Sequence, residues 1–215
     1  MSRRATLALV LLAAASAPSM AQVPFPPRPT GPNAWTSLSI GLLRVQDIYD
    51  PESDATWDFG NVVQFRGTLE REFQRGASIG VAASLARAPL TYVGPECGSC
   101  DADATLWQAL ALFRIGGGRF GLHQVIEVAA GVTGFSGFQE RGGDDLGSGT
   151  VIDPTLSIGF GLGYSLSPNT QFTFVQELGL MLHERGDRPA GDESNVPRTY
   201  ATRVGFRFGL GGWRR

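Results

Sequence analysis

The chain has 215 residues, a formal net charge of −2 and 18% charged residues, a composition that excludes a disordered polyelectrolyte. All 18 basic residues are arginine and they form no extended basic run, so nucleic-acid binding is not expected. Glycine, with 29 residues, is about twice as frequent as usual. The length suits one domain or one mid-sized barrel and excludes two large domains.

The N-terminus has the features of a secretory leader. Two arginines precede an apolar stretch that is too short for a transmembrane helix, and small residues follow up to Ala21. We therefore expect residues 1–21 to be a cleaved signal peptide. Residues 22–34 are rich in proline and are expected to form an extended periplasmic segment, and residues 35–215 are expected to form the barrel.

Period-two alternation then recurs in segments of about ten residues, which predicts a barrel wall with two unlike faces. The last segment shows the pattern best, because large apolar residues alternate with alanine, glycine and arginine from Tyr200 to Leu210. The alternation is blurred in three segments, and a bulge is expected at Leu42-Leu43. In chain order the eight expected strands lie at 35–46, 63–73, 77–92, 105–115, 120–133, 152–164, 171–182 and 200–210.

The connections between these strands alternate in length. Tight turns are expected at 74–76, 116–118 and 167–170, and long polar loops at 47–58, 94–104, 137–150 and 184–198. Short periplasmic turns and long external loops are typical of outer-membrane barrels. The sequence therefore predicts an all-β fold, an eight-stranded antiparallel up-and-down transmembrane β-barrel with both termini on the turn side.

A secreted soluble barrel is the structural alternative, because alternation alone does not tell which face is buried. The second face consists of glycine, serine and alanine with occasional arginine and glutamate, which favours the narrow interior of a membrane barrel. Aromatic residues are also expected to form girdles at the two interfaces. The turn-side girdle would hold Trp35, Phe73, Phe113, Phe120 and Phe172, and the loop-side girdle Trp57, Tyr92, Trp107 and Tyr200.

Over residues 35–213 this pattern resembles the small outer-membrane barrels of Gram-negative bacteria, the class of the transmembrane domain of outer-membrane protein A. The resemblance implies a location in the bacterial outer membrane, with outer-membrane lipids, lipopolysaccharide and the barrel-insertion machinery as partners. It also implies an aromatic insertion signal near the C-terminus, for which Phe208 and Trp213 are the candidates. A monomer without a cofactor or bound metal is expected.

Inward-facing charges are the first candidates for a functional site. Such charges must pair with one another in a narrow lumen, and we expect a structural plug rather than a proton path or a substrate site. Because the last two strands are neighbours, Glu177 is expected to contact Arg203 or Arg207. The expected network consists of Arg66, Glu70, His123, Glu127, Glu177, Arg203 and Arg207.

Two alternative functions are a lipopolysaccharide-modifying acyl hydrolase and a narrow porin-like channel. His123 and Glu127 are separated by roughly 13 Å of strand, too far for a hydrogen bond. Lipid A deacylases resemble one another in a His-x-Ser element, and neither His123 nor His183 is followed by that serine. We expect His183 to be solvated at the external rim, and we expect no enzymatic activity.

The long loops carry the remaining candidates. Cys97 and Cys100 are expected to form a disulfide, because the leader implies an oxidising compartment. The four loops contain fifteen acidic residues against four arginines, which predicts a solvated external face. Cation bridging to lipopolysaccharide phosphates or capture of a basic partner is the functional alternative. The sequence thus favours a structural or surface-interaction role.

Overall fold

The computed structural model describes residues 32–118, 120–143, 145–146, 149–183 and 196–211. The expected signal peptide, most of the proline-rich segment and Trp213 lie outside these residues. Among the described residues, no helix is long and apolar enough to cross a membrane.

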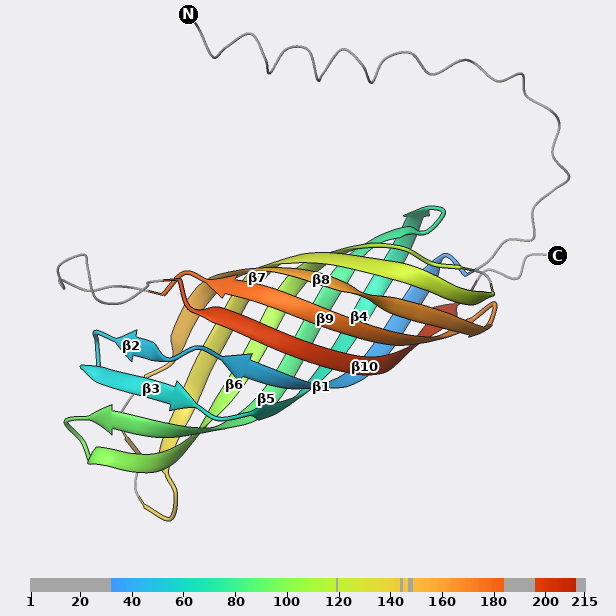
Figure 1. The fold of residues 1–215 in the computed structure, drawn as a ribbon. Coiled ribbons are helices and arrows are strands. Elements are labelled where there is room, and N and C mark those ends of the chain that lie inside the picture. Colours follow the sequence, from blue (N-terminus) through green and yellow to red (C-terminus); the bar gives the residue numbers. More distant parts are fainter. Residues whose placement is uncertain (1–31, 119, 144, 147–148, 184–195, 212–215) are drawn as a thin grey trace, which may run out of the picture.

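Ten strands form one antiparallel sheet that closes on itself (Figure 1). β1 pairs with β10, and the additional pairing of β5 with β6 completes the ring. β2 pairs only with β3, and this short hairpin lies between β1 and β4 in the chain, so the barrel wall itself has eight strands. The strands are β1 (Ala34–Val45), β2 (Ile48–Asp50), β3 (Ala55–Phe59), β4 (Val62–Gln74), β5 (Ala77–Gly94), β6 (Gly98–Ile115), β7 (Gly121–Glu140), β8 (Val151–Ser167), β9 (Thr170–Met181) and β10 (Arg198–Leu210). The prediction of an all-β, eight-stranded antiparallel up-and-down barrel is confirmed.

The two ends of the barrel differ, as the connection lengths predict. Tight turns join β4 to β5, β6 to β7 and β8 to β9 at one end, where Ala34 also pairs with Leu210. We call this the turn end. The opposite end, which we call the hairpin end, carries the β2–β3 hairpin and the tip of the β5–β6 hairpin (Figure 1). Residues 94–104, expected to be a loop, are mostly strand, because the β5–β6 ladder continues to the pair Gly94 and Gly98.

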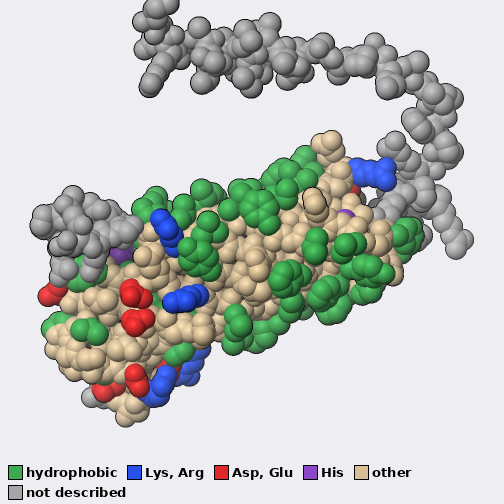
Figure 2. Space-filling model, in the orientation of Figure 1, with side chains coloured by type: hydrophobic (Ala, Val, Ile, Leu, Met, Phe, Trp, Pro, Cys, Tyr) green, Lys and Arg blue, Asp and Glu red, His purple; other side chains and the backbone are tan. Residues whose placement is uncertain are grey.

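An apolar belt covers the outside of the wall, whereas charged side chains gather toward the hairpin end (Figure 2). Large apolar side chains at alternate positions are exposed, as shown by Phe65 at 62% and Phe160 at 55%. Further members of the belt are Leu38, Leu69, Ile79, Val81, Leu85, Leu122, Leu156, Phe174, Val204 and Phe206. An exterior dominated by large apolar side chains suits hydrocarbon rather than water.

Replacing Phe174 with arginine is expected to destabilise the barrel in a lipid bilayer by about 2–4 kcal/mol. Phe174 pairs with Val204 and Leu162 halfway up the belt, where a guanidinium would be farthest from water. The measurement is the urea midpoint in vesicles. Leu182→Arg, beyond the hairpin-end margin of β9, is the control and should cost about 0–1 kcal/mol; equal losses would contradict a lipid-facing belt.

The inside of the barrel is polar toward the turn end and apolar toward the hairpin end. This change explains the blurred alternation in β1, where Leu42 points outward and Leu43 points inward. No bulge exists there, because the β1–β10 register runs unbroken from Ala34 to Val45. The buried apolar cluster at the hairpin end contains Leu43, Val45, Ile48, Ala55, Trp57, Phe59, Val62, Ala86, Ala88, Leu90, Tyr92, Ala102, Ala104, Leu106, Phe135, Phe138, Leu146, Met181 and Ala201.

The girdle prediction is wrong for three aromatic residues. Trp35, Trp57 and Tyr92 point into the barrel and are 4%, 0% and 0% exposed. Their height along the wall follows from the sequence. Their inward face could also have been predicted, because Trp35 has the same parity as Ser37, and polar Thr56 and Asp58 occupy the opposite face around Trp57. Tyr200, at 52% exposure, does lie on the outside.

Candidate functional site

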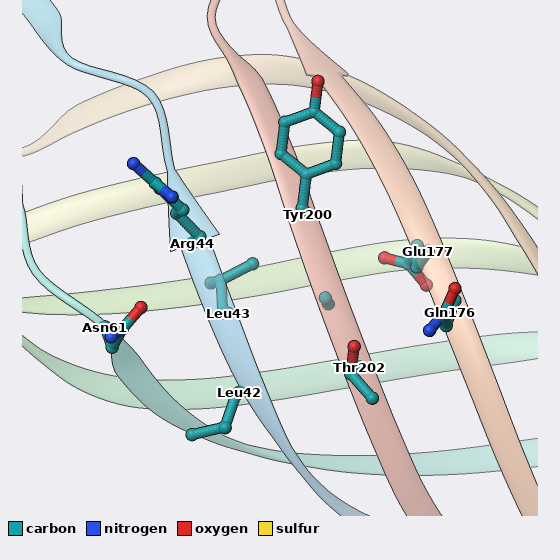
Figure 3. A pocket seen from close by; sticks show the side chains of 9 residues that line it. Leu42, Leu43, Arg44, Asn61, Gln176, Glu177, Tyr200 and Thr202 are labelled. Carbon is teal, nitrogen blue, oxygen red and sulfur yellow. The ribbon is translucent and has the colours of Figure 1, made fainter.

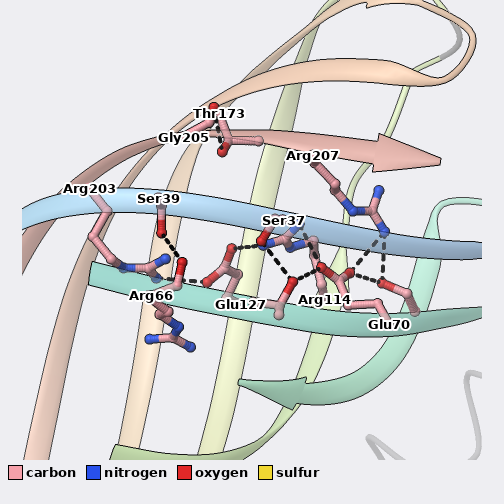
Figure 4. Close-up of polar contacts among 12 residues, drawn as sticks. Ser37, Ser39, Arg66, Glu70, Arg114, Glu127, Thr173, Arg203, Gly205 and Arg207 are labelled. Carbon is pink, nitrogen blue, oxygen red and sulfur yellow. Dashed lines mark hydrogen bonds and ion pairs between the residues drawn. The ribbon is translucent and has the colours of Figure 1, made fainter. Parts of the chain in front are cut away.

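The turn-end half of the lumen is filled by charged side chains that five strands point inward (Figure 4). Residues of equal parity share one face of a strand, so Arg66 and Glu70 on β4 both enter the lumen, as do Arg203 and Arg207 on β10. We call the set the lumen network. It consists of Arg66, Glu70, Arg114, Glu127, Glu177, Arg203 and Arg207.

Glu127 on β7 lies at the centre of the lumen network. Its Oε1 accepts a hydrogen bond from Arg114 Nη2 at 2.6 Å, and its Oε2 accepts one from Arg203 Nη2 at 2.8 Å. The residue is 1% exposed. A carboxylate buried this deeply is tolerable because both of its oxygens contact a guanidinium.

Glu177 and Glu70 extend the contacts in the two directions along the barrel. Glu177 Oε2 lies 2.6 Å from Arg203 Nη2 and 2.9 Å from Arg66 Nη1. Glu70 lies 3.0 Å from Arg114 Nη1 and 2.8 Å from Arg207 Nη2. The seven residues therefore form one chain of alternating charge that starts and ends on arginine, in the order Arg66, Glu177, Arg203, Glu127, Arg114, Glu70, Arg207.

Trp35 and Glu72 close the lumen at the turn end, next to these ion pairs. The Arg207 guanidinium lies 4.2 Å from the centre of the Trp35 ring, a cation–π contact. Trp35 Nε1 donates to Glu72 Oε2 at 3.3 Å. The inward position of Trp35 thus provides a cover for the turn end.

A neutral polar layer separates the lumen network from the apolar cluster. Gln64 Nε2 donates to Gln108 Oε1 at 2.9 Å, and Ser84 Oγ donates to the same oxygen at 2.8 Å. Gln108 Nε2 donates to Thr133 Oγ1 at 3.1 Å, and Thr155 Oγ1 donates to Thr133 Oγ1 at 2.8 Å. These five side chains link the consecutive wall strands β4, β5, β6, β7 and β8.

The apolar layer above them is built on Trp57. Its ring centre lies 4.5 Å from that of Phe138 and 5.7 Å from that of Phe135. Phe59 packs against Phe135 at 5.4 Å. The β2–β3 hairpin brings Trp57 into the barrel mouth, so the first long connection supplies part of the plug.

His183 lies above this apolar layer, between two carboxylates. Its Nδ1 is 2.8 Å from Asp153 Oδ2, and its Nε2 is 3.8 Å from Asp50 Oδ1. The ring also contacts Trp57 edge-on, and the residue is only 7% exposed. The expected solvated position at the rim is therefore wrong, because the β2–β3 hairpin covers it. The neighbouring residues 184–195 lie outside the described part of the chain.

The structure brings together six of the seven residues expected in the lumen. Glu177 contacts Arg203, whereas Arg207 contacts Glu70 instead. His123 lies apart: its Nδ1 is 3.3 Å from the Gly121 carbonyl oxygen, and its ring occupies the space over Gly163. Within the described residues, no ion pair joins it to the lumen network.

Sequence reasoning missed Arg114, the only contribution of β6 to the network. It follows an apolar run and precedes the Gly116–Gly118 turn, so it looks like a solvated residue beside a turn. The alternation of faces along β6 could have identified Arg114, because Gln108 and Arg114 are six residues apart and therefore share the inward face.

The hairpin end carries the remaining candidates. Cys97 and Cys100 are joined by a disulfide at the tip of the β5–β6 hairpin. Part of the acidic charge is compensated, because Asp103 contacts both Arg87 and Arg141 at 3.3 and 3.4 Å. Asp47 and Asp58, in contrast, lie beside each other. Partial burial and the neighbouring Asp58 raise the pKa of Asp47.

No protein-family model matches the chain, and no curated protein matches its sequence. Solved structures match its fold. Neisserial surface protein A superposes with a TM-score of 0.56 at 11% identity, over 83% of this chain and 97% of that one. The outer membrane protein OprG from Pseudomonas aeruginosa superposes with a TM-score of 0.54 at 12% identity, over 84% of this chain and 97% of that one. The chain has the fold of the small transmembrane outer-membrane barrels, and the fold class expected from the sequence is confirmed.

Proposed function

We propose that this protein is an outer-membrane barrel with a closed lumen, and that it has a structural or surface-interaction role exercised by its hairpin end. The observation that carries the proposal is the filling of the lumen by three successive layers. Ion pairs connect non-adjacent strands in the charged layer, hydrogen bonds link five consecutive strands in the neutral polar layer, and aromatic rings pack together in the apolar layer.

The lumen network is the first barrier to a solute. No side chain in its six ion pairs is more than 8% exposed. A solute could pass only if several buried carboxylates lost their guanidinium partners, and each such loss is costly in a poorly solvated space. The network therefore supports a plug rather than a conducting path.

The apolar layer is a second and independent barrier. Trp57, Phe135 and Phe138 are each 0% exposed, and they fill the barrel mouth where a porin would need water. Ions would lose their hydration in this layer without meeting compensating charges. A porin-like role is therefore disfavoured by both halves of the lumen.

Among the residues that the structure describes, no nucleophile is hydrogen-bonded to the histidine of the hydrolase alternative. Within the described residues, Asp153 is the hydrogen-bond partner of His183 Nδ1, and Nε2 has none. A serine or water activated by this ring would need to reach Nε2, which lies beneath the β2–β3 hairpin. Ser194, eleven residues after His183 in the sequence, lies outside the described residues.

The position in the cell belongs to the same proposal. The fold supports an outer-membrane location, with the turn end in the periplasm and the hairpin end outside, as in barrels of this type. Export by cleavage of residues 1–21 and insertion by the barrel machinery follow from this location. Outer-membrane lipids and lipopolysaccharide would surround a monomer.

Planar-bilayer recording tests the closed lumen. The folded protein is expected to show no steady conductance, because both layers block the path of ions. An open, reproducible conductance would overturn the proposal in favour of a channel. Release of acyl chains from lipopolysaccharide, abolished in His183→Ala, would overturn it in favour of the hydrolase.

A further inference from the structure

A polar patch interrupts the apolar exterior near the hairpin end. In the β-ladder, Arg44 on β1 lies directly opposite Tyr200 on β10, and Leu42 lies opposite Thr202. Thr202 in turn lies opposite Gln176 on β9. Asn61 immediately precedes β4, next to the pair that Leu43 makes with Val62. We call Arg44, Asn61, Gln176, Tyr200 and Thr202 the wall patch.

The wall patch surrounds a pocket of about 300 Å³ (Figure 3). All five side chains are exposed on the outside of the barrel, and Leu42, at 60% exposure, provides an apolar side to the pocket. Leu43, Glu177 and Ala201, whose side chains turn inward, complete the lining. The pocket therefore combines one cation, several neutral hydrogen-bonding groups and apolar surface.

The height of the wall patch places it at a membrane interface. Tyr200 and Leu210 are ten residues apart on a tilted strand, which corresponds to roughly 25 Å along the barrel, the height of an apolar belt. With Leu210 at the turn-end margin, Tyr200 and Arg44 lie at the opposite margin. Gln176 and Thr202 lie one pair deeper, where the surrounding hydrocarbon offers them no hydrogen bonds.

Arg44 differs from Arg87 and Arg141, two other outward-facing arginines of the hairpin end. Arg87 and Arg141 both contact Asp103, whereas no ion pair of Arg44 exists within the described residues. The charge of Arg44 acts on Asp47, but burial and the neighbouring Asp58 outweigh it and raise the pKa of that carboxyl. A guanidinium beside a pocket at the interface can form charge-assisted hydrogen bonds with a phosphate.

We infer that the wall patch binds the phosphate headgroup of an anionic lipid in the leaflet at the hairpin end, with Arg44 contacting the phosphate. Tyr200, Thr202 and Gln176 would hydrogen-bond the rest of the headgroup, and an acyl chain would lie along Leu42. The inference rests on the proposed position in an outer membrane, and it adds a defined lipid site to that proposal.

Native mass spectrometry of the folded, detergent-solubilised protein tests this site. The probes are diphosphoryl lipid A, the same lipid after removal of its phosphates, and inorganic phosphate. The phosphorylated lipid should bind about tenfold more tightly than the phosphate-free lipid, and Arg44→Gln should remove that difference. Arg87→Gln, which removes the same charge from the same end, is the matched control and should leave binding unchanged.

Two further variants separate the site from general charge effects. Asp47→Asn should strengthen binding, because it removes the carboxylate that competes for Arg44. Gln176→Leu, which matches the surrounding belt and should fold normally, should weaken it. Equal binding of both lipids, equal losses in the two arginine variants, or no effect of Gln176→Leu would overturn the inference.

Displacement of the lipid by millimolar inorganic phosphate would point to a free-anion site and would also overturn it. None of these outcomes changes the conductance expected in planar-bilayer recording. Failure of the lipid site and failure of the closed-lumen proposal can therefore be distinguished.

Discussion

Replacing Glu127 with glutamine is expected to lower the urea midpoint of the barrel. The substitution keeps the side-chain shape but leaves Arg114 and Arg203 without the carboxylate between them. Breaking a buried pair costs about 3–5 kcal/mol, and the lower part of that range applies because each arginine retains a second carboxylate. The measurement is urea unfolding in lipid vesicles.

Neutralising one of the facing arginines supplies the internal test of this prediction. Glu127→Gln combined with Arg114→Gln should recover part of the lost stability, because the excess positive charge falls again. Glu96→Gln, at the exposed tip of the β5–β6 hairpin, should change nothing. A Glu127 variant as stable as the Glu96 variant would show that water screens the lumen network.

Replacing Trp57 with alanine is expected to destabilise the barrel by about 3–5 kcal/mol, because a large, fully buried ring is removed. The loss includes the contacts with Phe135, Phe138 and His183. The variant should still conduct no ions, because the lumen network remains below the cavity. Urea unfolding and bilayer recording on the same preparation measure both expectations.

Trp107→Ala is the matched control for Trp57→Ala. Trp107 lies on the outward face of β6, where its ring covers Gly134 of β7 and a Cβ would have no room. Its removal exposes wall surface without opening a cavity in the lumen, so a smaller loss is expected. Similar losses for the two tryptophans would contradict the assignment of Trp57 to the plug.

The sequence predicts the outside of this barrel much better than its inside. Outward residues from Val204 to Leu210 all suit lipid, so one rule applies along this part of the strand and period-two alternation follows. Inward residues obey different rules at different heights. Near Leu43 they fill an apolar layer, and because Leu42 on the opposite face of β1 is also apolar, the alternation is concealed there.

The sequence pattern also did not predict where the strands end or which charged side chains pair with each other. Outside the belt, Asp101 and Asp103 alternate with buried Ala102 and Ala104, a polar composition that suggests a loop although β6 continues through it. Within the lumen, the pairing of Glu177 with Arg66 depends on the barrel closing, because β4 and β9 are not neighbours. Local spacing contains no information on such contacts.

The lumen network also bears on how the barrel assembles. Arg66 and Glu177 are 111 positions apart in the chain, and Glu70 and Arg207 are 137 apart. In a sheet that has not yet joined β1 to β10, these two ion pairs cannot form, and the entropic cost of bringing the two edges together is not yet compensated. Both form when the seam closes, so a partly closed barrel gains neither of them. We therefore expect closure to be cooperative, and loss of the β1–β10 seam to release both halves of the chain at once rather than by gradual fraying.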